Sequence, residues 1–541
     1  MNQITKKDTS RWYLRIGRAN EIAGRRDRII YRALEIMPGI LAWSTLIGFV
    51  LLSAFKPVVV AVFIILFDVY WLVKVVFLSF HLRSGYRRMS QNLKIDWWAK
   101  LKERADWEEY WHLIILPMYK EPLEVVLPTF QALADSRYDK QKMIVVLALE
   151  ERGGEEPKKV AEVLREKFGR EFFKFLVTIH PQDIAGELAG KGSNETWAAK
   201  RVKEEIIDPL NLPYEKIITS VFDIDTNVWP QYFALLTYRF ITHPNPTRAS
   251  FQPIPFFTNN IWEAPALARV VSFSSSFWLT MQQERPERQV TFSSHSMSFK
   301  TLAEIGFWQT NIVSEDSRIF WQCYNFFNGE YETVSLYAPV YMDAAVDRTF
   351  WTSMKALYKQ QRRWAWGTEN LVYVLFAFLK NKKVPLAQKL RHGFNLVEGY
   401  YSWATNALII FLMGWLPVIL GGAAFNVTLL SYNLPRITRT IMILAMVGLV
   451  SSAVISINTL PPRPPQYGRY KYIWMILQWL LVPFTTIVFG SIPALDAQSR
   501  LMLGRYMGFW VTPKSRNNPE TGKGSGKHLF PRSGNTKTEG F

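Results

Sequence analysis

Cysteine is nearly absent from this chain, whose 541 residues include only Cys323. A single cysteine excludes a disulfide within the chain and a zinc site built on several cysteine ligands. A catalytic thiol is conceivable, but Cys323 follows an expected helix start and sits beside Trp321 and Tyr324, which favours a packing role. The chemistry of the chain is therefore expected from other side chains.

Several binding motifs are missing as well. The sequence contains no Walker loop, no Gly-x-Gly-x-x-Gly, no zinc-ligand spacing, no RNP motif and no basic helix with a zipper. The net charge of +19 would suit either nucleic acid or anionic lipid and nucleotide phosphates. The basic residues gather beside apolar runs, and those before the first run are Lys6, Lys7, Arg11, Arg15, Arg18, Arg25, Arg26 and Arg28. Positive-inside bias predicts this placement, so we expect membrane lipids as partners and no nucleic acid.

Long hydrophobic runs are present in two blocks. Each run is roughly the 20 residues that span a bilayer, and the runs are Ile36–Phe55, Pro57–Phe80, Phe394–Leu420, Ile441–Leu460 and Tyr472–Ile492. The break at Lys56-Pro57 predicts a tight hairpin, and the long basic stretch before it is unlike a cleavable signal, so the N-terminus should stay in the cytoplasm.

The number of crossings is open between five and six. Five crossings would place the C-terminus outside, whereas the tail is basic at Arg500, Arg505, Lys514, Arg516, Lys523 and Lys527. We favour a cytoplasmic C-terminus, which requires that one run is a hairpin or does not cross fully.

Between the two blocks, from about Trp107 to Lys380, short apolar runs alternate with charged helical stretches. The runs read as buried strands, and they are His112–Pro117, Met143–Leu149, Phe173–Ile179 and Ile217–Phe222. This alternation predicts an α/β domain with a mostly parallel sheet, in which ligands bind at the carboxyl ends of strands. Met118–Pro122 follows the first run, and Asp223-Ile224-Asp225 follows the fourth.

Asp223 and Asp225 are the clearest candidates for a metal site. In a strand, residues i and i+2 point the same way, so both carboxylates could face one ligand. Hard oxygen donors suit Mg²⁺ or Mn²⁺, which they would share with a diphosphate. The alternative is a pair of exposed loop aspartates, but the strand before them and the motifs after them favour the metal site.

A second acidic segment, Ser314-Glu315-Asp316, precedes a run with helical spacing. It can be an N-cap followed by first-turn acids that the helix dipole stabilises. It can also supply a carboxylate that deprotonates an acceptor hydroxyl, and both functions can share one turn.

A basic and aromatic segment, Gln360–Trp364, lies within Phe350–Leu379, where apolar residues recur at helical intervals. One interpretation is an interfacial amphipathic helix. The other is that Arg363 binds a phosphate in bidentate fashion and Trp364 offers a stacking surface. The lone His295 is expected to make structural hydrogen bonds.

Taken in order, these segments resemble the membrane-integrated family-2 glycosyltransferases, which include cellulose, chitin and hyaluronan synthases. Leu116–Pro122 is similar to the Pro-x-Tyr-Asn-Glu loop of the family, Lys191–Asn194 to its Lys-Ala-Gly-x-x-Asn segment and Asp223-Ile224-Asp225 to its Asp-x-Asp. Glu315-Asp316 resembles the Thr-Glu-Asp, Gln360-x-x-Arg363-Trp364 the Gln-x-x-Arg-Trp of the processive branch, and Phe509–Lys514 the Phe-x-Val-Thr-x-Lys gating segment of cellulose synthases.

The resemblance implies a GT-A fold, a Rossmann-like and mostly parallel sheet, as a cytoplasmic domain inserted between two groups of transmembrane helices. It implies inverting transfer from a nucleotide-diphosphate sugar, with a UDP-sugar favoured, and Mg²⁺ or Mn²⁺ held by Asp223 and Asp225. Asp316 would be the general base. By family role the donor would be bound by Tyr119, Glu121, Glu151, Lys191, Asp223, Gln360 and Arg363, and the acceptor by His295, Glu315 and Trp364.

The chain departs from the family pattern at three places. Glu150–Gly153 stands where the family has Asp-Asp-Gly, so the nucleotide contact there needs a longer carboxylate. Ser314 replaces Thr, and Lys120 replaces Asn and adds positive charge near the donor. These changes bear on the base and the sugar more than on the reaction type.

The expected parts are a basic cytoplasmic N-terminus (1–35), a transmembrane hairpin (36–83), the GT-A domain (84–349), amphipathic interface helices (350–393), C-terminal transmembrane helices (394–499) and a basic, partly disordered cytoplasmic tail (500–541). The leading hypothesis is an enzyme of the plasma (inner) membrane that extends a polysaccharide, coupled to export. The alternatives are transfer of a single sugar to a lipid acceptor and an inactive scaffold or transporter with a degenerate domain.

Overall fold

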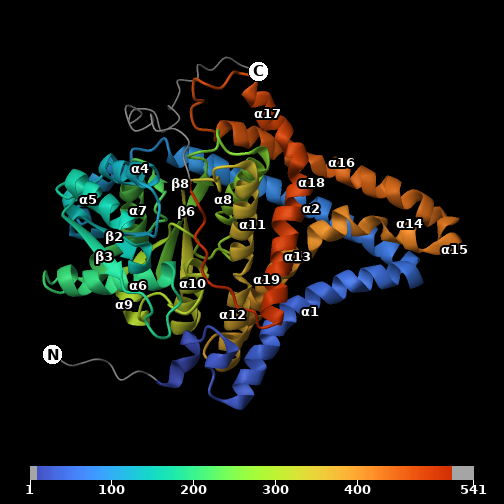
Figure 1. Ribbon diagram of the computed structural model, residues 1–541, viewed down its shortest axis with the longest axis horizontal. Coiled ribbons are helices and arrows are strands. Elements are labelled where there is room, and N and C mark those ends of the chain that lie inside the picture. Colours follow the sequence, from blue (N-terminus) through green and yellow to red (C-terminus); the bar gives the residue numbers. More distant parts are fainter. Residues whose placement is uncertain (1–8, 515–541) are drawn as a thin grey trace.

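The computed structural model describes residues 9–514 of the chain, and Figure 1 shows how they are arranged. A sheet domain lies on one side, a bundle of long helices extends away from it, and residues 503–514 return along the sheet domain. Lys6, Lys7, Arg516, Lys523 and Lys527, together with the tail predicted to be disordered, lie outside the described residues.

The sheet domain is built on one eight-stranded sheet in the order β3-β2-β1-β4-β7-β6-β8-β5. The strands are β1 (Trp111–Met118), β2 (Met143–Glu150), β3 (Lys174–His180), β4 (Ile217–Val221), β5 (Asn227–Val228), β6 (Ala249–Phe257), β7 (Ser296–Ser298) and β8 (Glu332–Met342). The four predicted strands are confirmed as β1 to β4, and they pair in parallel. The other half is mixed, because β7 pairs antiparallel with β4 and β6 while β8 runs parallel to β6.

Helices cover both faces of this sheet. Leu113 and Ile115 of β1 face one layer and Ile114 and Leu116 the other, and all four are fully buried. The layer on Ile114 contains α3 (Trp97–Lys102), α4 (Leu123–Ala134), α5 (Glu156–Phe168) and α7 (Tyr232–Thr242), and the opposite layer contains α6 (Lys191–Val202), α9 (Phe299–Ile305) and α10 (Glu315–Phe326). A strand buried on both faces is a nearly continuous apolar run, and for this reason the sequence revealed β1, β2 and β4. The edge strand β3 is partly exposed but retains the apolar run 175–177.

Three helices connect the sheet domain to the bundle: α8 (Ala266–Gln282), α11 (Phe350–Ala365) and α12 (Thr368–Lys380). The single helix expected over Phe350–Leu379 is broken at Trp366 and Gly367. A Cβ on Gly367 would lie 2.9 Å from Oη of Tyr400, so the corner packs closely on the bundle. Most of α12 is buried, which differs from the interfacial surface expected for residues 350–393.

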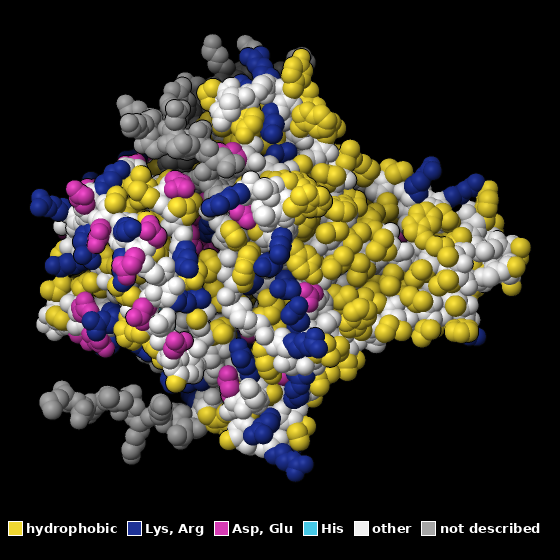
Figure 2. Space-filling view, in the orientation of Figure 1, with side chains coloured by type: hydrophobic (Ala, Val, Ile, Leu, Met, Phe, Trp, Pro, Cys, Tyr) yellow, Lys and Arg dark blue, Asp and Glu magenta, His cyan; other side chains and the backbone are white. Residues whose placement is uncertain are grey.

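Four helical stretches are long and apolar enough to cross a membrane, or five if a bent pair is one span. The four are α1 (Arg25–Phe55), α2 (Pro57–Asn92), α16 (Leu429–Asn458) and Lys471–Met502, and the bent pair is α13 (Leu386–Phe411) with Met413–Leu420, at 48°. The hairpin predicted at Lys56-Pro57 is confirmed. Figure 2 shows a nearly continuous apolar surface over the bundle and a mixed charged surface over the sheet domain, with Lys and Arg gathered where the two meet.

Far from the sheet domain, the tips of these helices pack together. Phe49 and Ala61, near the α1–α2 turn, share a cluster with Ile409, Phe425 and Leu434. Phe425 belongs to α15 (Gly422–Asn426), which with α14 (Leu416–Leu420) connects α13 to α16 at that end of Figure 1. The chain therefore runs outward along α1 and α13 and returns along α2 and α16.

The last apolar stretch has a different course. It consists of α17 (Lys471–Leu477), η10 (Gln478–Leu481), α18 (Val482–Thr485), η11 (Thr486–Ser491) and α19 (Ile492–Met502), and it packs along α8 and α11 (Figure 1). Near its start Arg269 of α8 donates to Gln478 at 2.7 Å, and near its end Arg362 of α11 donates to Asp496 at 2.8 Å. Both ends thus lie beside the sheet domain. If Lys471–Met502 does not cross, it is the incomplete crossing that a C-terminus on the side of the N-terminus requires.

The N-terminal segment packs on the sheet domain. It contains the 3-10 helices η1 (Thr9–Arg15) and η2 (Ala19–Glu21). Arg11 donates to the carbonyl of Phe326 at 2.8 Å, and the guanidinium of Arg18 lies 5.0 Å from the ring of Tyr506. These two arginines, expected to flank lipid, contact protein.

Cysteine labelling tests this course, because Cys323 is buried. In sealed vesicles we expect a membrane-impermeant maleimide to reach Lys56→Cys from one side and both Gly468→Cys and Arg505→Cys from the other, since all three positions are exposed. Labelling of Gly468→Cys and Arg505→Cys from opposite sides would show that Lys471–Met502 crosses the bilayer.

Candidate active site

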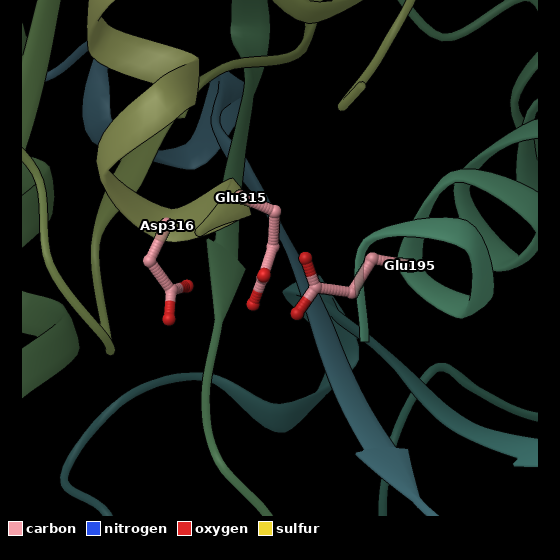
Figure 3. Close-up of side chains that lie close together, drawn as sticks. All are labelled: Glu195, Glu315 and Asp316. Carbon is pink, nitrogen blue, oxygen red and sulfur yellow. The ribbon is translucent and has the colours of Figure 1, made fainter. Parts of the chain in front are cut away.

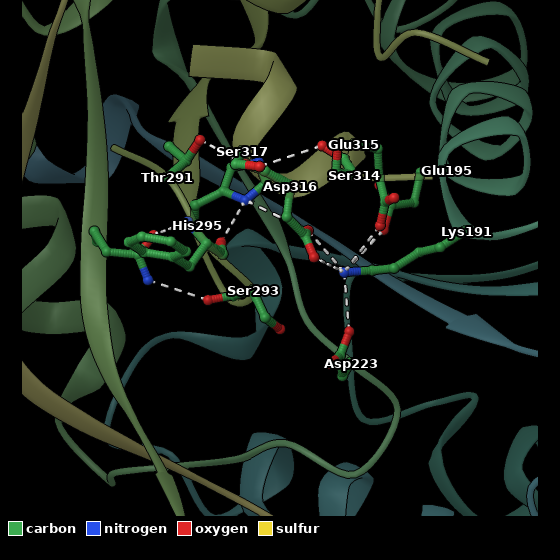
Figure 4. A network of polar contacts seen from close by, with 12 residues as sticks. Lys191, Glu195, Asp223, Thr291, Ser293, His295, Ser314, Glu315, Asp316 and Ser317 are labelled. Atoms are coloured by element: carbon green, nitrogen blue, oxygen red, sulfur yellow. Dashed lines mark hydrogen bonds and ion pairs between the residues drawn. The ribbon is translucent and has the colours of Figure 1, made fainter. Parts of the chain in front are cut away.

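Four carboxylates meet at the ammonium group of Lys191, at the start of α6 (Figure 4). Lys191 Nζ lies 2.8 and 2.9 Å from the two oxygens of Asp316 and 2.9 Å from Oδ1 of Asp223. Glu195 and Glu315 place an oxygen 3.5 and 3.8 Å from the same nitrogen. The chain fold thus brings together Lys191, Asp223 and Asp316, which the resemblance assigned to one site.

Electrostatics in this cluster favours a charged lysine. Burial would lower the pKa of Lys191, but Asp223, Asp316 and the two glutamates raise it well above its ordinary value. Burial would raise the pKa of Asp223, but Lys191, Lys514 and Arg363 hold it well below its ordinary value. Arg363, on α11, is therefore close enough to act on the acids although it makes no ion pair with them among the described residues.

Glu195, Glu315 and Asp316 form a compact group, in which one oxygen of each lies within 4.8 Å of the others (Figure 3). Their side chains differ in exposure, at 0% for Glu195, 2% for Glu315 and 22% for Asp316. Asp316 is thus the member that a substrate can reach. Glu315 is buried against Gly192 and Glu195, which differs from the acceptor contact expected for it.

Sequence reasoning missed Glu195. The available signal was its position four residues after Lys191, which places both side chains on one face of a helix. Among residues 9–514 neither carboxylate oxygen of Glu195 has a hydrogen-bond partner, although Oε1 lies 3.5 Å from Lys191 Nζ, and burial raises the pKa of Glu195 well above its ordinary value.

Asp223 and Asp225 do not continue β4, which ends at Val221, but lie in the turn that follows. Their position just past a strand end is therefore as expected, but the alignment that a strand would give the two side chains is absent, and the two carboxylates bind different partners. Asp225 Oδ1 accepts from Lys514 Nζ at 2.5 Å, and its Oδ2 accepts from the backbone N–H of Asp343 at 2.8 Å. Burial raises the pKa of Asp225, and Lys514 opposes that shift.

Residues 509–514 lie over the site. Phe509 packs against Gly190, where a Cβ would lie 2.6 Å from the ring, so only glycine allows this approach. The guanidinium of Arg363 lies 5.0 Å from the ring of Phe509, and Lys359 Nζ lies 5.0 Å from the ring of Trp510. The segment thus joins α6 and α11, and Lys514 reaches the acid turn from it.

The predicted nucleotide loop lies at the end of β1. Glu121 turns back to accept hydrogen bonds from the backbone of Tyr119 and Lys120, at 2.8 and 3.1 Å. The guanidinium of Arg152 lies 4.4 Å from the ring of Tyr119. A cavity of about 120 Å³ opens beside Arg152, and Glu150 also lines this cavity.

Two other residues that were predicted to bind the donor sugar nucleotide differ in how deeply they are buried. Glu151 accepts from the backbone N–H of Gln182 at 3.0 Å, while Gln182 lines the cavity. Gln360 is buried one turn before Arg363 on α11.

The acceptor candidates lie around the acids. His295 is fully buried, its Nδ1 lies 3.0 Å from the carbonyl of Phe292 and 3.9 Å from Asp316 Oδ1, and burial lowers its pKa. Burial thus favours the neutral imidazole, while Asp316 opposes this shift, and Nε2 has no partner among the described residues. Trp364 packs on Phe257 with ring centroids 5.5 Å apart, beside the site and outside the carboxylate cluster.

Comparison with known proteins identifies the family. Residues 218–492, half of the chain, match a family model described as glycosyl transferase family group 2. The chain belongs to this family. As a family-2 glycosyltransferase it has the expected GT-A domain among apolar helices, and the match contains Asp223, Asp225, Glu315, Asp316 and the Gln-x-x-Arg-Trp segment.

Solved structures with a partial similarity to this chain include other glycosyltransferases. A mannosyltransferase from Pyrobaculum calidifontis in complex with GDP-Man and Mn²⁺ has 13% identity and a TM-score of 0.38, covering 71% of this chain and 99% of its own. S. aureus TarS 1–349 in complex with UDP has 11% identity and a TM-score of 0.33, and the match covers 64% of this chain and 91% of the TarS chain. The complex of TarS 1–349 with UDP-GlcNAc has 12% identity and a TM-score of 0.32, and the match covers 65% of this chain and 93% of the TarS chain. A search of curated proteins gave no match.

The carboxylate cluster of this glycosyltransferase should make its stability depend on pH. Burial and the neighbouring Asp316 raise the pKa of Glu315 to about 8. The folded protein then keeps a proton that the unfolded chain has lost, so the free energy of unfolding falls as pH rises from about 4.5 to 8, by at most about 1.4 kcal/mol per pH unit.

We expect Glu315→Gln, which cannot ionise, to flatten the fall of Tm between pH 6 and pH 8. The exposed Glu330→Gln is the matched control and should keep the wild-type slope. An unchanged slope in Glu315→Gln would contradict the assignment.

Proposed function

We propose that this glycosyltransferase moves a sugar from a nucleotide-diphosphate sugar to an acceptor at the membrane surface, with inversion of the anomeric carbon. The observation that carries the proposal is the partly exposed carboxylate of Asp316, which shares Lys191 with Asp223 at the carboxyl end of the sheet. A base candidate and diphosphate-binding cations thus lie in one site beside the apolar bundle.

In the proposed step Asp316 accepts the proton of an acceptor hydroxyl. The hydroxyl oxygen forms a bond to the anomeric carbon while the bond from that carbon to the diphosphate breaks, and the nucleoside diphosphate leaves. Lys191, Arg363 and Lys514 offer positive charge to the leaving diphosphate, because all three act on Asp223. Charge placed where negative charge develops is commonly the largest catalytic contribution.

The residues of the acid turn fit a divalent cation. Asp223 and Asp225 offer carboxylate oxygens, and each already pairs with an ammonium group, Lys191 or Lys514. Mg²⁺ or Mn²⁺ held there would neutralise the diphosphate. The Glu195–Glu315–Asp316 group fits less well, because burial raises the pKa of Glu195 and of Glu315 and a metal ligand must be deprotonated.

The nucleoside of the donor is proposed to lie between Tyr119 and the cavity beside Arg152. Glu150, His180 and Gln182 line that cavity and offer hydrogen-bond groups to a base. A UDP-sugar remains the favoured donor, by resemblance to the family. Glu150 and Glu151 are both candidates for the acid that the family has after its second strand, because Glu150 also faces the cavity.

The acceptor is proposed to be a growing polysaccharide, exported as it grows. The support is the Gln-x-x-Arg-Trp segment of α11, whose Arg363 touches the segment over the site and whose Trp364 lies beside it. The boundary rich in Lys and Arg supports a cytoplasmic sheet domain on the plasma (inner) membrane (Figure 2).

A lipid acceptor that takes a single sugar is the second candidate. A groove of about 230 Å³ with an almost entirely apolar lining, including Leu449, Ala453 and Trp479, lies between α16 and η10 and would suit an acyl chain.

Asp316→Asn tests the reaction. Detergent-solubilised protein is incubated with a panel of nucleotide sugars and Mn²⁺ or Mg²⁺, and nucleotide release is measured. We expect a loss of roughly 10²- to 10⁴-fold, because the amide cannot accept the proton. Asp106→Asn, in an exposed ion pair with Arg104, is the matched control and should change turnover little. Wild-type turnover in Asp316→Asn would contradict the assignment of the base.

Product size separates the two acceptors. If the proposal holds, purified protein with its donor makes polymer, which a polysaccharide hydrolase degrades. A single glycolipid product instead would support the lipid acceptor.

A further inference from the structure

A buried glutamate outside the family motifs binds the turn that carries the base. Glu369, in the first turn of α12, is 7% exposed. Its Oε1 accepts hydrogen bonds from the backbone N–H groups of Val313 and Ser314, at 3.1 and 2.9 Å, and from the Ser314 hydroxyl at 2.6 Å. Three donors on one oxygen fix the two residues that lead into Glu315 and Asp316.

The other oxygen of Glu369 holds the corner between α11 and α12. Oε2 accepts from the indole N–H of Trp366 at 2.9 Å, and Trp366 is 1% exposed. Trp366 lies three residues after Arg363, which makes the cation–π contact with the covering segment. One carboxylate thus joins the base turn to the helix that carries Arg363.

Ser314 shows that this bond replaces an ordinary helix cap. It occupies the N-cap position of α10, where a serine hydroxyl commonly accepts a backbone N–H of the first turn. Here its side chain makes no capping hydrogen bond and donates to Glu369 instead. The expected N-cap is therefore present by position only, and the orientation of the first turn of α10 depends on α12.

The next residue of α12 reinforces the connection. Asn370 accepts from Nε of Arg318 at 2.5 Å and donates to the hydroxyl of Ser317 at 2.8 Å. Two consecutive residues of α12 therefore bind the residues that precede Asp316 in the chain and the residues that follow it. Glu369 accepts four hydrogen bonds and the side chain of Asn370 makes two, so Glu369 makes the more extensive connection.

We propose that Glu369 is a positioning residue, which sets the place of Asp316 relative to Arg363 by binding Ser314 and Trp366 together. The inference rests on the proposed function, because it assigns the base to Asp316 and the diphosphate to Arg363. A displacement of about 1 Å in a catalytic group can cost about 10²-fold in rate, so a rigid connection between the two groups serves turnover.

The chemistry of Glu369 makes the proposal testable with an isosteric change. All four of its hydrogen-bond partners are donors, and a carboxylate only accepts. In Glu369→Gln the amide N–H₂ must face either Trp366 or Ser314, donor against donor. Removing the indole donor with Trp366→Phe relieves that conflict.

The experiment measures kcat, KM for the donor sugar nucleotide, and Kd for the nucleoside diphosphate in Glu369→Gln, Trp366→Phe and the double variant. We expect Glu369→Gln to lower kcat by roughly 10- to 100-fold while Kd changes less than about threefold. In the Trp366→Phe background, Glu369→Gln should lower kcat by less than about fivefold. Glu284→Gln, another largely buried glutamate that binds Ser84 and Arg88 away from the site, is the matched control and should keep wild-type kcat.

Three results would overturn the proposal: wild-type kcat in Glu369→Gln, an equal loss in both backgrounds, or a loss of nucleotide affinity that accounts for the fall in rate. If Glu369→Gln does not fold, Glu369→Asp in the two backgrounds replaces it, since the shorter carboxylate cannot reach both partners; wild-type kcat there overturns the proposal equally. Failure of the proposed function is distinguishable, because wild-type protein would then release no nucleotide from any donor.

Discussion

The ammonium group of Lys191 lies between carboxylates that separate segments of the chain supply: Glu195 from α6, Asp223 from the turn after β4, and Glu315 with Asp316 from α10. Two like charges 4 Å apart repel by about 4 kcal/mol at an effective dielectric of 20. Buried carboxylates gathered without a cation would therefore separate or stay protonated. Lys191 attracts the charged members of the cluster, and the raised pKa values of Glu195 and Glu315 reduce the repulsion that remains. The placement of α6, the acid turn and α10 around one point depends on both effects.

The same electrostatic arrangement extends to the bundle. Lys514 gives Asp225 its cation, and Phe509 and Trp510 hold its segment against Gly190, Arg363 and Lys359. The segment comes from the end of α19, where Arg32 donates to the carbonyl of Leu501 at 2.9 Å. Glu35, which like Arg32 belongs to α1, accepts from the hydroxyl of Tyr506 at 2.9 and 3.0 Å. The cytoplasmic end proposed for α1 therefore anchors the segment that covers the site.

Local patterns predicted the parts of the fold that are locally determined. β1, β2 and β4 are buried on both faces and β3 is a partly exposed edge strand, but all four contain apolar runs. α1 and α2 are long apolar helices separated at Lys56-Pro57, so the pattern of apolar residues alone revealed all six elements. β5 to β8 were not predicted. β5 and β7 are very short, and β8 contains a proline and partly exposed residues. β6 is buried throughout, but Gln252, Pro253 and Pro255 interrupt its apolar run.

What the sequence could not supply is which distant groups meet. The family motifs placed Lys191, Asp223 and Asp316 in one site, yet they assigned Lys191 to the nucleotide and not to the acids. Glu195 carried one local signal, its spacing of four residues from Lys191, although its contact with Glu315 and Asp316 crosses the fold. The hydrogen bonds that the Glu369 side chain accepts come from residues that lie before its helix in the chain, so no periodicity within α12 marks it. The course of Lys471–Met502 along α8 and α11 was equally hidden, because hydropathy reports length and not direction.

The most direct test of the account is binding of a nucleoside diphosphate, measured by calorimetry on the solubilised protein with Mn²⁺ and with a chelator, in wild type and in Asp223→Asn. If the acids around Lys191 form one donor site that takes a divalent ion, affinity should fall at least about tenfold when the ion is removed, and by a similar factor in Asp223→Asn. Equal affinity under all these conditions would place the nucleotide elsewhere and contradict the account.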